Sequence, residues 1–319
     1  MIDRSAALVT VFGGAGFIGR YVCEALMKSG ARVRIAQRNP RQAYIIQPLG
    51  QVGQLGVVGA DITNRASVAL ALEGADAAIN LCGVFGRRMH GVHVEGAANI
   101  AAAASDAGAN ALVHISAIGA SVDSDSDYGR TKGQGEAAVR TAFPNATIIR
   151  PSLVFGPEDN LTNRFAGMAS LPFLPVLAAR RNFQPVYVRD LASAIAAAAL
   201  DPMTFGGKTF EIGGPQVMSM VELQREIMGL SGQDADVVEL PDLVGQVLSS
   251  SVGWLPGAPL TRDQWRMLQH DNVTAKGSQG LEAFGIAPTP LAAVGREWLG
   301  RYRSGGKFAG RRVDIGATS

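Results

Sequence analysis

The sequence Gly13-Gly14-Ala15-Gly16-Phe17-Ile18-Gly19 is the feature that most constrains the fold of this chain. It follows an apolar run at residues 7–12, typical of a buried strand, and it opens a segment of helical character at residues 17–29. In such a unit the first glycine allows a tight turn, and the second lets a pyrophosphate approach the backbone. The third glycine lets the helix pack closely on the strand, and the helix N-terminus offers free N–H groups to the phosphates. The stretch therefore predicts a dinucleotide-binding loop.

The spacing of these glycines is G-x-x-G-x-x-G and differs from the standard fingerprint G-x-G-x-x-G. A glycine trio also occurs in ordinary strand–turn–helix units that bind nothing. The strand before it, the helix after it and its place at the start of the fold favour cofactor binding over that alternative.

Apolar strand-like segments and helical segments alternate along the first half of the chain. Such alternation predicts a parallel sheet with helices on both faces, and hence an α/β fold of the doubly wound Rossmann type. A reversal of the strand order next to the first strand would place a ligand crevice at the carboxyl ends of the strands. We expect strands at residues 7–12, 31–36, 54–59, 75–81, 111–115 and 146–150, and helices at residues 17–29, 90–107 and 128–143.

The regular alternation ends near residue 150, and it divides the chain into three predicted regions. Residues 1–150 form the dinucleotide-binding core, and residues 151–303 form a small substrate or lid region interleaved with the last sheet strands. Residues 304–319 form a disordered tail. Residues 156–185, rich in Pro, Gly, Arg and Phe, are typical of loops over a pocket. Later elements are a short strand at 184–190, a helix at 191–200, a strand and turn at 210–215, and a helix capped by Ser219.

The composition excludes several classes of protein. A chain of 319 residues with 47% hydrophobic content can bury a large core, and a net charge of +2 gives no reason to expect nucleic acid as a partner. Two cysteines, Cys23 and Cys82, indicate a reducing compartment without a disulfide framework. The first strand begins close to Met1, so we expect no signal or transit peptide, and no apolar run is long enough to cross a bilayer. We therefore expect a cytoplasmic protein, either soluble or peripheral on the cytoplasmic face of the inner membrane.

The end of the second predicted strand indicates which dinucleotide is bound. Sites that prefer NAD carry a carboxylate about 20 residues past the glycines, where it binds the ribose 2′-hydroxyl. No Asp or Glu occurs between Gly30 and Gly59, whereas Arg38 and Arg41 offer planar guanidinium groups that match a 2′-phosphate. Both arginines could instead be solvated loop residues. The missing acid and the arginines together favour NADP(H) over NAD(H).

Ser116, Tyr128 and Lys132 form the candidate catalytic group. Tyr128 and Lys132 are four residues apart at the start of a predicted helix, so both side chains lie on one helix face. A phenol is a weak base at neutral pH, but a neighbouring ammonium favours the phenolate and makes Tyr128 a usable proton donor and acceptor. Ser116, at the end of a strand, would bond the same substrate oxygen. A Tyr–Lys pair at this spacing also occurs on ordinary surface helices, but the glycine loop and Ser116 favour the catalytic role.

The sequence does not indicate a metal site. Residues 121–127 are rich in Ser and Asp but lack the glycine and the terminal Glu of a calcium-binding loop. His93 and His114 show no metal-ligand spacing, and we expect them to be packed residues of a helix and a strand.

Several short motifs together carry a resemblance to known enzymes. They are the glycine loop, Asp61, Asn80-Leu81-Cys82-Gly83, Ser116, the Tyr128/Lys132 pair, Arg150-Pro151-Ser152 and Val188-Arg189-Asp190. This set resembles the extended or atypical short-chain dehydrogenase/reductases, which are NAD-dependent epimerase/dehydratase-like proteins. Residues 150–159, 163–166 and 184–188 are similar to the NADPH-binding accessory subunit family of respiratory complex I. That similarity implies a tightly held, structural NADPH without established turnover.

The glycine loop and this resemblance together imply a set of cofactor contacts. Asp61 either contacts the adenine or caps the following helix, and Lys132 holds the ribose and tunes Tyr128. No metal is expected. The expected cofactor-binding residues are Gly13, Gly16, Phe17, Ile18, Gly19, Arg38, Asp61, Ile62, Leu81, Cys82, Gly83, Asn99, Tyr128, Lys132 and Pro151.

Three functions follow from these observations. The first, favoured by the retained Tyr128 and Lys132, is an NADP-dependent oxidoreductase acting on a small carbonyl or alcohol substrate. The second is a non-catalytic, NADPH-bound accessory or assembly subunit of respiratory complex I, for which residues 243–255 are the candidate apolar docking face. The third is a nucleotide-sugar epimerase or dehydratase. The expected partners are accordingly a small-molecule substrate or respiratory-complex subunits.

Overall fold

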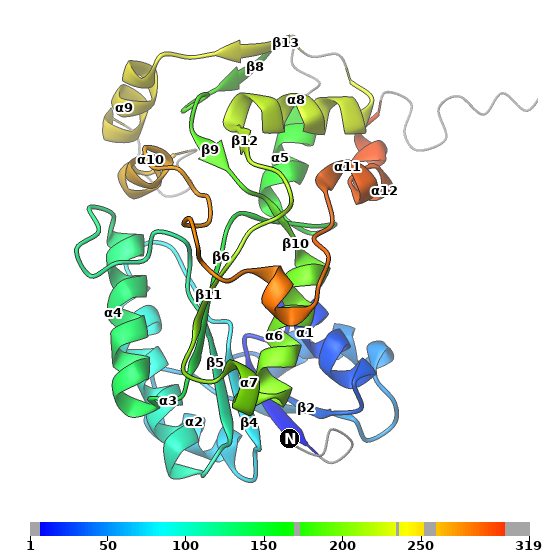
Figure 1. Cartoon of the computed structure of the whole chain (residues 1–319), viewed down its shortest axis with the longest axis vertical. Coiled ribbons are helices and arrows are strands. Elements are labelled where there is room, and N and C mark those ends of the chain that lie inside the picture. Colours follow the sequence, from blue (N-terminus) through cyan, green and yellow to red (C-terminus); the bar gives the residue numbers. More distant parts are fainter. Residues whose placement is uncertain (1–6, 169–172, 234–235, 252–259, 304–319) are drawn as a thin grey trace, which may run out of the picture.

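A parallel sheet of seven strands forms the centre of the fold, as the alternation predicted (Figure 1). The computed structural model describes residues 7–168, 173–233, 236–251 and 260–303. The strand order β11-β6-β5-β4-β1-β2-β3 reverses next to β1, which is where a doubly wound sheet forms its ligand crevice. The strands are β1 (Leu8–Phe12), β2 (Arg32–Gln37), β3 (Leu55–Gly59), β4 (Ala77–Asn80), β5 (Ala111–Ile115), β6 (Thr147–Pro151) and β11 (Thr209–Ile212).

Helices cover both faces of this sheet. Helices α1 (Phe17–Lys28) and α6 (Val188–Leu200) pack together on one face, and α2 (Arg65–Leu72), α3 (Gly96–Asp106) and α4 (Asp127–Ala142) line the other (Figure 1). Because side chains alternate along a strand, β1 contributes to two separate cores. Its Val9 and Val11 lie in the core under α1 and α6, and its Phe12 lies in the core under α2 and α3.

The second half of the chain builds a smaller region above the carboxyl edge of the sheet (Figure 1). We predicted loops for residues 156–185, and this prediction was wrong, because α5, β8 and β9 lie there. These elements pair with distant segments, so no local pattern marked them: β8 pairs with β13, and β9 pairs with β12. Besides α6 and β11, the second half of the chain contains β7 (Val154–Phe155), α5 (Asn160–Met168), β8 (Phe173–Val176), β9 (Asn182–Phe183), β10 (Val186–Tyr187), α7 (Pro202–Phe205), β12 (Met218–Ser219), α8 (Met220–Ser231), β13 (Asp236–Glu239), α9 (Asp242–Ser251), α10 (Arg262–Leu268), η3 (Leu281–Phe284), α11 (Leu291–Val294), α12 (Arg296–Leu299) and η4 (Gly300–Tyr302). Of these, α7 and η3 pack against α6 beside the central sheet.

Several predicted boundaries differ in detail. The helix expected at residues 90–107 begins with a π-helical turn, η2 (Gly91–Glu95), and continues as α3. The segment η1 (Pro40–Leu49) was not predicted. Asp61 does not cap the following helix, because Asn64 accepts the N–H groups of Ala66 and Ser67 at the start of α2.

Some expectations concern residues outside the described part of the chain. The predicted tail at 304–319 and residues 252–255 of the apolar segment lie there, whereas residues 243–251 of that segment belong to α9. Both cysteines are free thiols. Within the described ranges, no helix combines the length and apolar character needed to span a bilayer, and no cluster of His, Cys, Asp and Glu suits a metal ion.

Candidate functional site

A cleft of about 890 Å³ opens where β1, β2, β3 and β4 end. Its position matches the crevice expected at the reversal of strand order. Eight of the residues expected to bind the cofactor line it: Gly13, Gly16, Arg38, Asp61, Ile62, Leu81, Cys82 and Gly83.

The glycine loop forms one wall of this cleft. Gly13, Gly16 and Gly19 each differ in the reason why a side chain would be unfavourable there. Gly13 has a φ of +81°, a conformation that side chains disfavour. A Cβ on Gly19 would lie only 2.4 Å from the carbonyl oxygen of Gly13, so α1 packs directly on the loop. Gly16 is exposed and caps α1 without a side-chain acceptor, and within the described part of the chain a Cβ there would meet only the Gly13 oxygen, at 3.2 Å. The loop thus keeps a helix N-terminus open toward the cleft.

The far wall of the cleft is basic. Arg38 lines it, as do Arg87 and Arg88 from the loop after β4, whereas Arg41 is exposed and not among the lining residues. At the end of β2, where NAD sites carry an acid, Gln37 accepts a hydrogen bond from the backbone N–H of Ala15 (3.3 Å). The two arginines after β4 had no sequence signal, because the loop that carries them has no regular pattern.

Asp61 is the single carboxylate among the described residues that line the cleft. It accepts hydrogen bonds from the N–H and hydroxyl of Thr63, at 3.0 and 2.8 Å. These bonds, with help from the positive charges of Arg38 and Arg88, lower the pKa of Asp61 below its usual range. Asp61 is therefore an ionised group that faces arginines at the open side of the cleft.

Several other predicted cofactor residues lie behind the cleft wall and are not among its lining residues. Asn99 donates a hydrogen bond to the carbonyl oxygen of Ile62 (3.0 Å) and so holds the wall in place. Phe17 packs edge-on against Tyr21, with ring centroids 6.2 Å apart. Pro151 ends β6, where its carbonyl oxygen accepts the N–H of Ile118. Phe17, Ile18, Gly19, Asn99, Tyr128, Lys132 and Pro151 do not line the cleft itself.

Lys132 lies behind Gly83, which lines the cleft. Its Nζ donates to the carbonyl oxygen of Ile115 (2.9 Å) and lies 3.6 Å from where a Cβ on Gly83 would be. The side chain is buried, and burial lowers its pKa to about 8. Ser116, the residue after β5, is also buried, and its Oγ has no hydrogen-bond partner among the described residues. A buried hydroxyl without a partner is costly, so it is a group that a ligand can satisfy.

Tyr128 lies in the first turn of α4 beside Lys132, as predicted. Its ring stacks on Phe85 (centroids 4.6 Å apart) and meets His93 edge-on (5.3 Å). The Nζ of Lys132 lies 6.0 Å from the ring centroid. We expected the ammonium to favour the phenolate, but burial raises the pKa of Tyr128 to about 12 instead. Its hydroxyl is therefore protonated at neutral pH and suits proton donation.

His93 is packed, as expected, but it also shapes this site. Its Nε2 accepts the N–H of Val84 (3.1 Å), so Nδ1 carries the proton and faces the Thr131 hydroxyl at 2.9 Å. Burial, with the charge of Lys132, lowers the pKa of His93 to about 3, so the ring is neutral. Through these two hydrogen bonds, His93 connects the loop that contains Phe85 with α4.

The burial of Lys132 predicts that the stability of the nucleotide-free protein depends on pH. Because its folded-state pKa of about 8 lies below the ordinary value of 10.5, the unfolded chain binds more protons between these pH values. Burying the charged Lys132 therefore lowers the free energy of unfolding. The loss is complete below pH 8 and becomes smaller as the pH rises toward 10.5. We expect Lys132→Met to raise the free energy of unfolding below pH 8 by about 3 kcal/mol and to flatten the profile.

Urea unfolding between pH 7 and 10.5 checks this expectation, with Lys208→Met at an exposed lysine as the control. Parallel profiles for wild type and Lys132→Met would contradict it.

Comparison with known proteins agrees with the resemblance inferred from the motifs. The sequence model of the NAD dependent epimerase/dehydratase family matches residues 9–213. The chain is 34% identical over 308 residues to NADH dehydrogenase [ubiquinone] 1 alpha subcomplex subunit 9, mitochondrial, of Rattus norvegicus. The alignment covers 94% of this chain and 81% of the rat protein. It is 29% identical to the ceramide reductase of Caulobacter vibrioides, over 76% of each chain.

Solved structures share the fold. An NADPH-dependent quinone oxidoreductase of Escherichia coli, complexed with NADPH, superposes with a TM-score of 0.71 at 19% identity, covering 89% of this chain and 97% of the other. The family match, the relatives and the sheet topology lead to one conclusion: this chain belongs to the NAD dependent epimerase/dehydratase family.

Proposed function

We propose that the protein holds NADP(H) in the cleft as a lasting ligand and serves as an accessory subunit of a respiratory complex I. Nucleotide binding is supported by one observation: the open glycine loop and the guanidinium groups of Arg38, Arg87 and Arg88 line the same cleft. The partner part is supported by the similarity, over 94% of the chain, to a mitochondrial complex I subunit. In this role the protein would lie peripherally, at the cytoplasmic face of the membrane.

The residues of the cleft suit this nucleotide. The backbone around Gly13 and Gly16 leaves room for a pyrophosphate at the start of α1, where the helix dipole favours negative charge. Arg38 and Arg88 would hold a 2′-phosphate, and Asp61 and Ile62 would flank the adenine. Lys132 would contact the nicotinamide ribose near Gly83.

A second candidate function, reduction of a small carbonyl compound, is supported by Ser116, Tyr128 and Lys132. A bound NADPH supplies a hydride. The unpartnered Oγ of Ser116 would hold the substrate oxygen, and the protonated hydroxyl of Tyr128 would give that oxygen its proton. Lys132 would stay close to the ring of Tyr128 and favour the phenolate that results.

Native mass spectrometry of the freshly purified protein tests the main proposal. We expect one NADPH per chain, and comigration of the protein with NADH dehydrogenase activity in solubilised membranes. Membranes of cells without the protein should lose part of that activity. Protein free of nucleotide and without affinity for NADP(H) would overturn the proposal.

Arg38 is the residue proposed to distinguish NADPH from NADH. We expect Arg38→Ala to weaken NADPH binding by about 1.5–3 kcal/mol, the range of a hydrogen bond to a charged group, and to leave NADH binding nearly unchanged. Isothermal titration calorimetry with both nucleotides measures the difference. Arg41→Ala is the matched control, because Arg41 lies close in sequence but does not line the cleft. Equal losses of affinity for NADPH and NADH would show that Arg38 does not bind the 2′-phosphate.

A further inference from the structure

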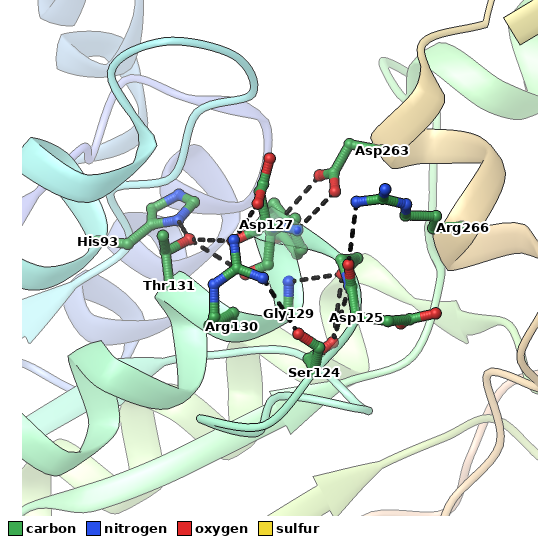
Figure 2. Close-up of polar contacts among 11 residues, drawn as sticks. His93, Ser124, Asp125, Asp127, Gly129, Arg130, Thr131, Asp263 and Arg266 are labelled. Carbon is green, nitrogen blue, oxygen red and sulfur yellow. Dashed lines mark hydrogen bonds and ion pairs between the residues drawn. The ribbon is translucent and has the colours of Figure 1, made fainter. Parts of the chain in front are cut away.

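Helix α10 lies against the first turn of α4, far from it in sequence (Figure 2). The carboxylate of Asp263 accepts hydrogen bonds from the backbone N–H groups of Asp127 (2.5 Å) and Tyr128 (3.0 Å). Figure 2 shows Asp263 directed at Asp127 from the neighbouring helix. The helix that carries Tyr128 is thus bonded at its N-terminus by a residue 135 positions further along the chain.

The bonds from Asp263 complete the capping of α4. The side-chain hydroxyl of the N-cap residue Ser126 accepts the N–H of Gly129, at 2.9 Å. The N–H groups of Asp127 and Tyr128 would otherwise be among the orphan donors of a helix end. A carboxylate is the strongest acceptor for them, and its charge also suits the positive end of the helix dipole.

The position of Asp263 is itself well determined. A capping box of Thr261 and Gln264 starts α10, and Arg266 donates to the carbonyl oxygen of Asp125 at 3.2 Å (Figure 2). On the other side of α10, the buried Trp265 packs so closely on α9 that a Cβ on Gly245 would lie 2.3 Å from its ring. The helix is therefore held between α9 and α4.

We propose that Asp263 is a positioning residue for Tyr128. It fixes the first turn of α4, so that the Tyr128 ring stays between Phe85 and His93 and close to Lys132. It also links that turn to the C-terminal region, so a displacement of α10 disturbs Tyr128. The purpose of this link rests on the second candidate function, in which Tyr128 gives the proton, but the link itself is a property of the protein without nucleotide.

Asp263→Ala and Asp263→Asn test the proposal in the full chain, with Asp271→Ala as the matched control. Asp271 is a carboxylate in the same segment, and its partner in the described part of the chain is Asn182, which donates its backbone N–H and its side-chain amide, and not α4. Hydrogen exchange of the Asp127 and Tyr128 amides, followed by NMR, is the first readout. We expect Asp263→Ala to speed this exchange about tenfold to a hundredfold, and Asp263→Asn, which keeps one acceptor oxygen, to have a smaller effect.

The second readout is the ring signal of Tyr128 in protein with ¹³C-labelled tyrosine, assigned with Tyr128→Phe. Ring currents from Phe85 and His93 act on this signal, so we expect it to move in Asp263→Ala and not in Asp271→Ala. Unchanged exchange and an unchanged ring signal in Asp263→Ala would overturn the proposal. Equal changes in both alanine variants would also overturn it, since they would indicate general loosening of the segment.

If the wild-type protein shows turnover, enzymatic activity is a third readout. We expect Asp263→Ala to lower kcat more than it raises KM, and to cause no further loss in the Tyr128→Phe background. An additive loss would overturn the route through Tyr128. Failure of wild type to bind NADP(H) would instead contradict the proposed function, and the exchange and ring-signal results would stand by themselves.

Discussion

We expect Gly16→Val to abolish NADPH binding and to leave the protein folded. The structure explains why the two effects separate at this residue: Gly16 is exposed to the cleft, and a Cβ would meet only one backbone atom, at 3.2 Å. A branched side chain would therefore fill the space of the pyrophosphate without disturbing the core. Calorimetric titration with NADPH, together with circular dichroism and thermal unfolding of the nucleotide-free protein, measures both effects.

Gly19→Val is the contrasting variant. Its Cβ would lie 2.4 and 2.5 Å from the carbonyl oxygens of Gly13 and Gly14, so we expect loss of fold as well as of binding. A folded Gly16→Val protein that binds NADPH with the affinity of wild type would show that the loop is not the phosphate site.

If the protein is a reductase, we expect Tyr128→Phe to lower turnover about 10²–10⁴-fold, because the variant keeps the ring but removes the proton donor. The stacking on Phe85 and the contact with His93 survive the change, so we expect NADPH affinity to be nearly unchanged. The measurement is NADPH oxidation across a panel of aldehydes, ketones and quinones. Tyr21→Phe is the control, because the Tyr21 hydroxyl donates to Glu158, away from the cleft.

The same pair of variants distinguishes the accessory-subunit function. If the nucleotide is only structural, Tyr128→Phe should change neither thermal stability nor complex I activity, whereas Gly16→Val should reduce both through the loss of the bound ligand. Wild-type turnover that survives Tyr128→Phe would end the catalytic assignment. A wild type without turnover on any of these substrates, copurifying with respiratory subunits, would exclude the reductase.

Features that depend on local sequence could be predicted. The glycine loop, the sheet strands and the start of α4 at Tyr128 follow from glycine spacing, apolar runs and helix start signals, all of which act within about 20 residues. The missing acid after β2 was visible for the same reason. Even the position of the cleft followed, because right-handed crossovers leave few topologies for a parallel sheet.

Features that depend on contacts between distant segments could not be predicted. Arg87, Arg88 and Phe85 lie in an irregular loop, and only its path in space brings them to the cleft and to the Tyr128 ring. The small sheets β8–β13 and β9–β12 join strands with little local signal, which is why residues 156–185 were assigned to loops.

By itself, the sequence of this protein determined the doubly wound sheet, the glycine-rich loop after its first strand and the identity of the side chains available for chemistry, because these depend on near neighbours in the chain. The tertiary structure alone decided the protonation states of those side chains and the contacts that hold them in position. The spacing of Tyr128 and Lys132 predicted that the ammonium favours the phenolate, but burial of the phenol raises the pKa of Tyr128 to about 12. The cap that Asp263 places on α4 likewise exists only because folding brings together two helices that are 135 residues apart at this contact.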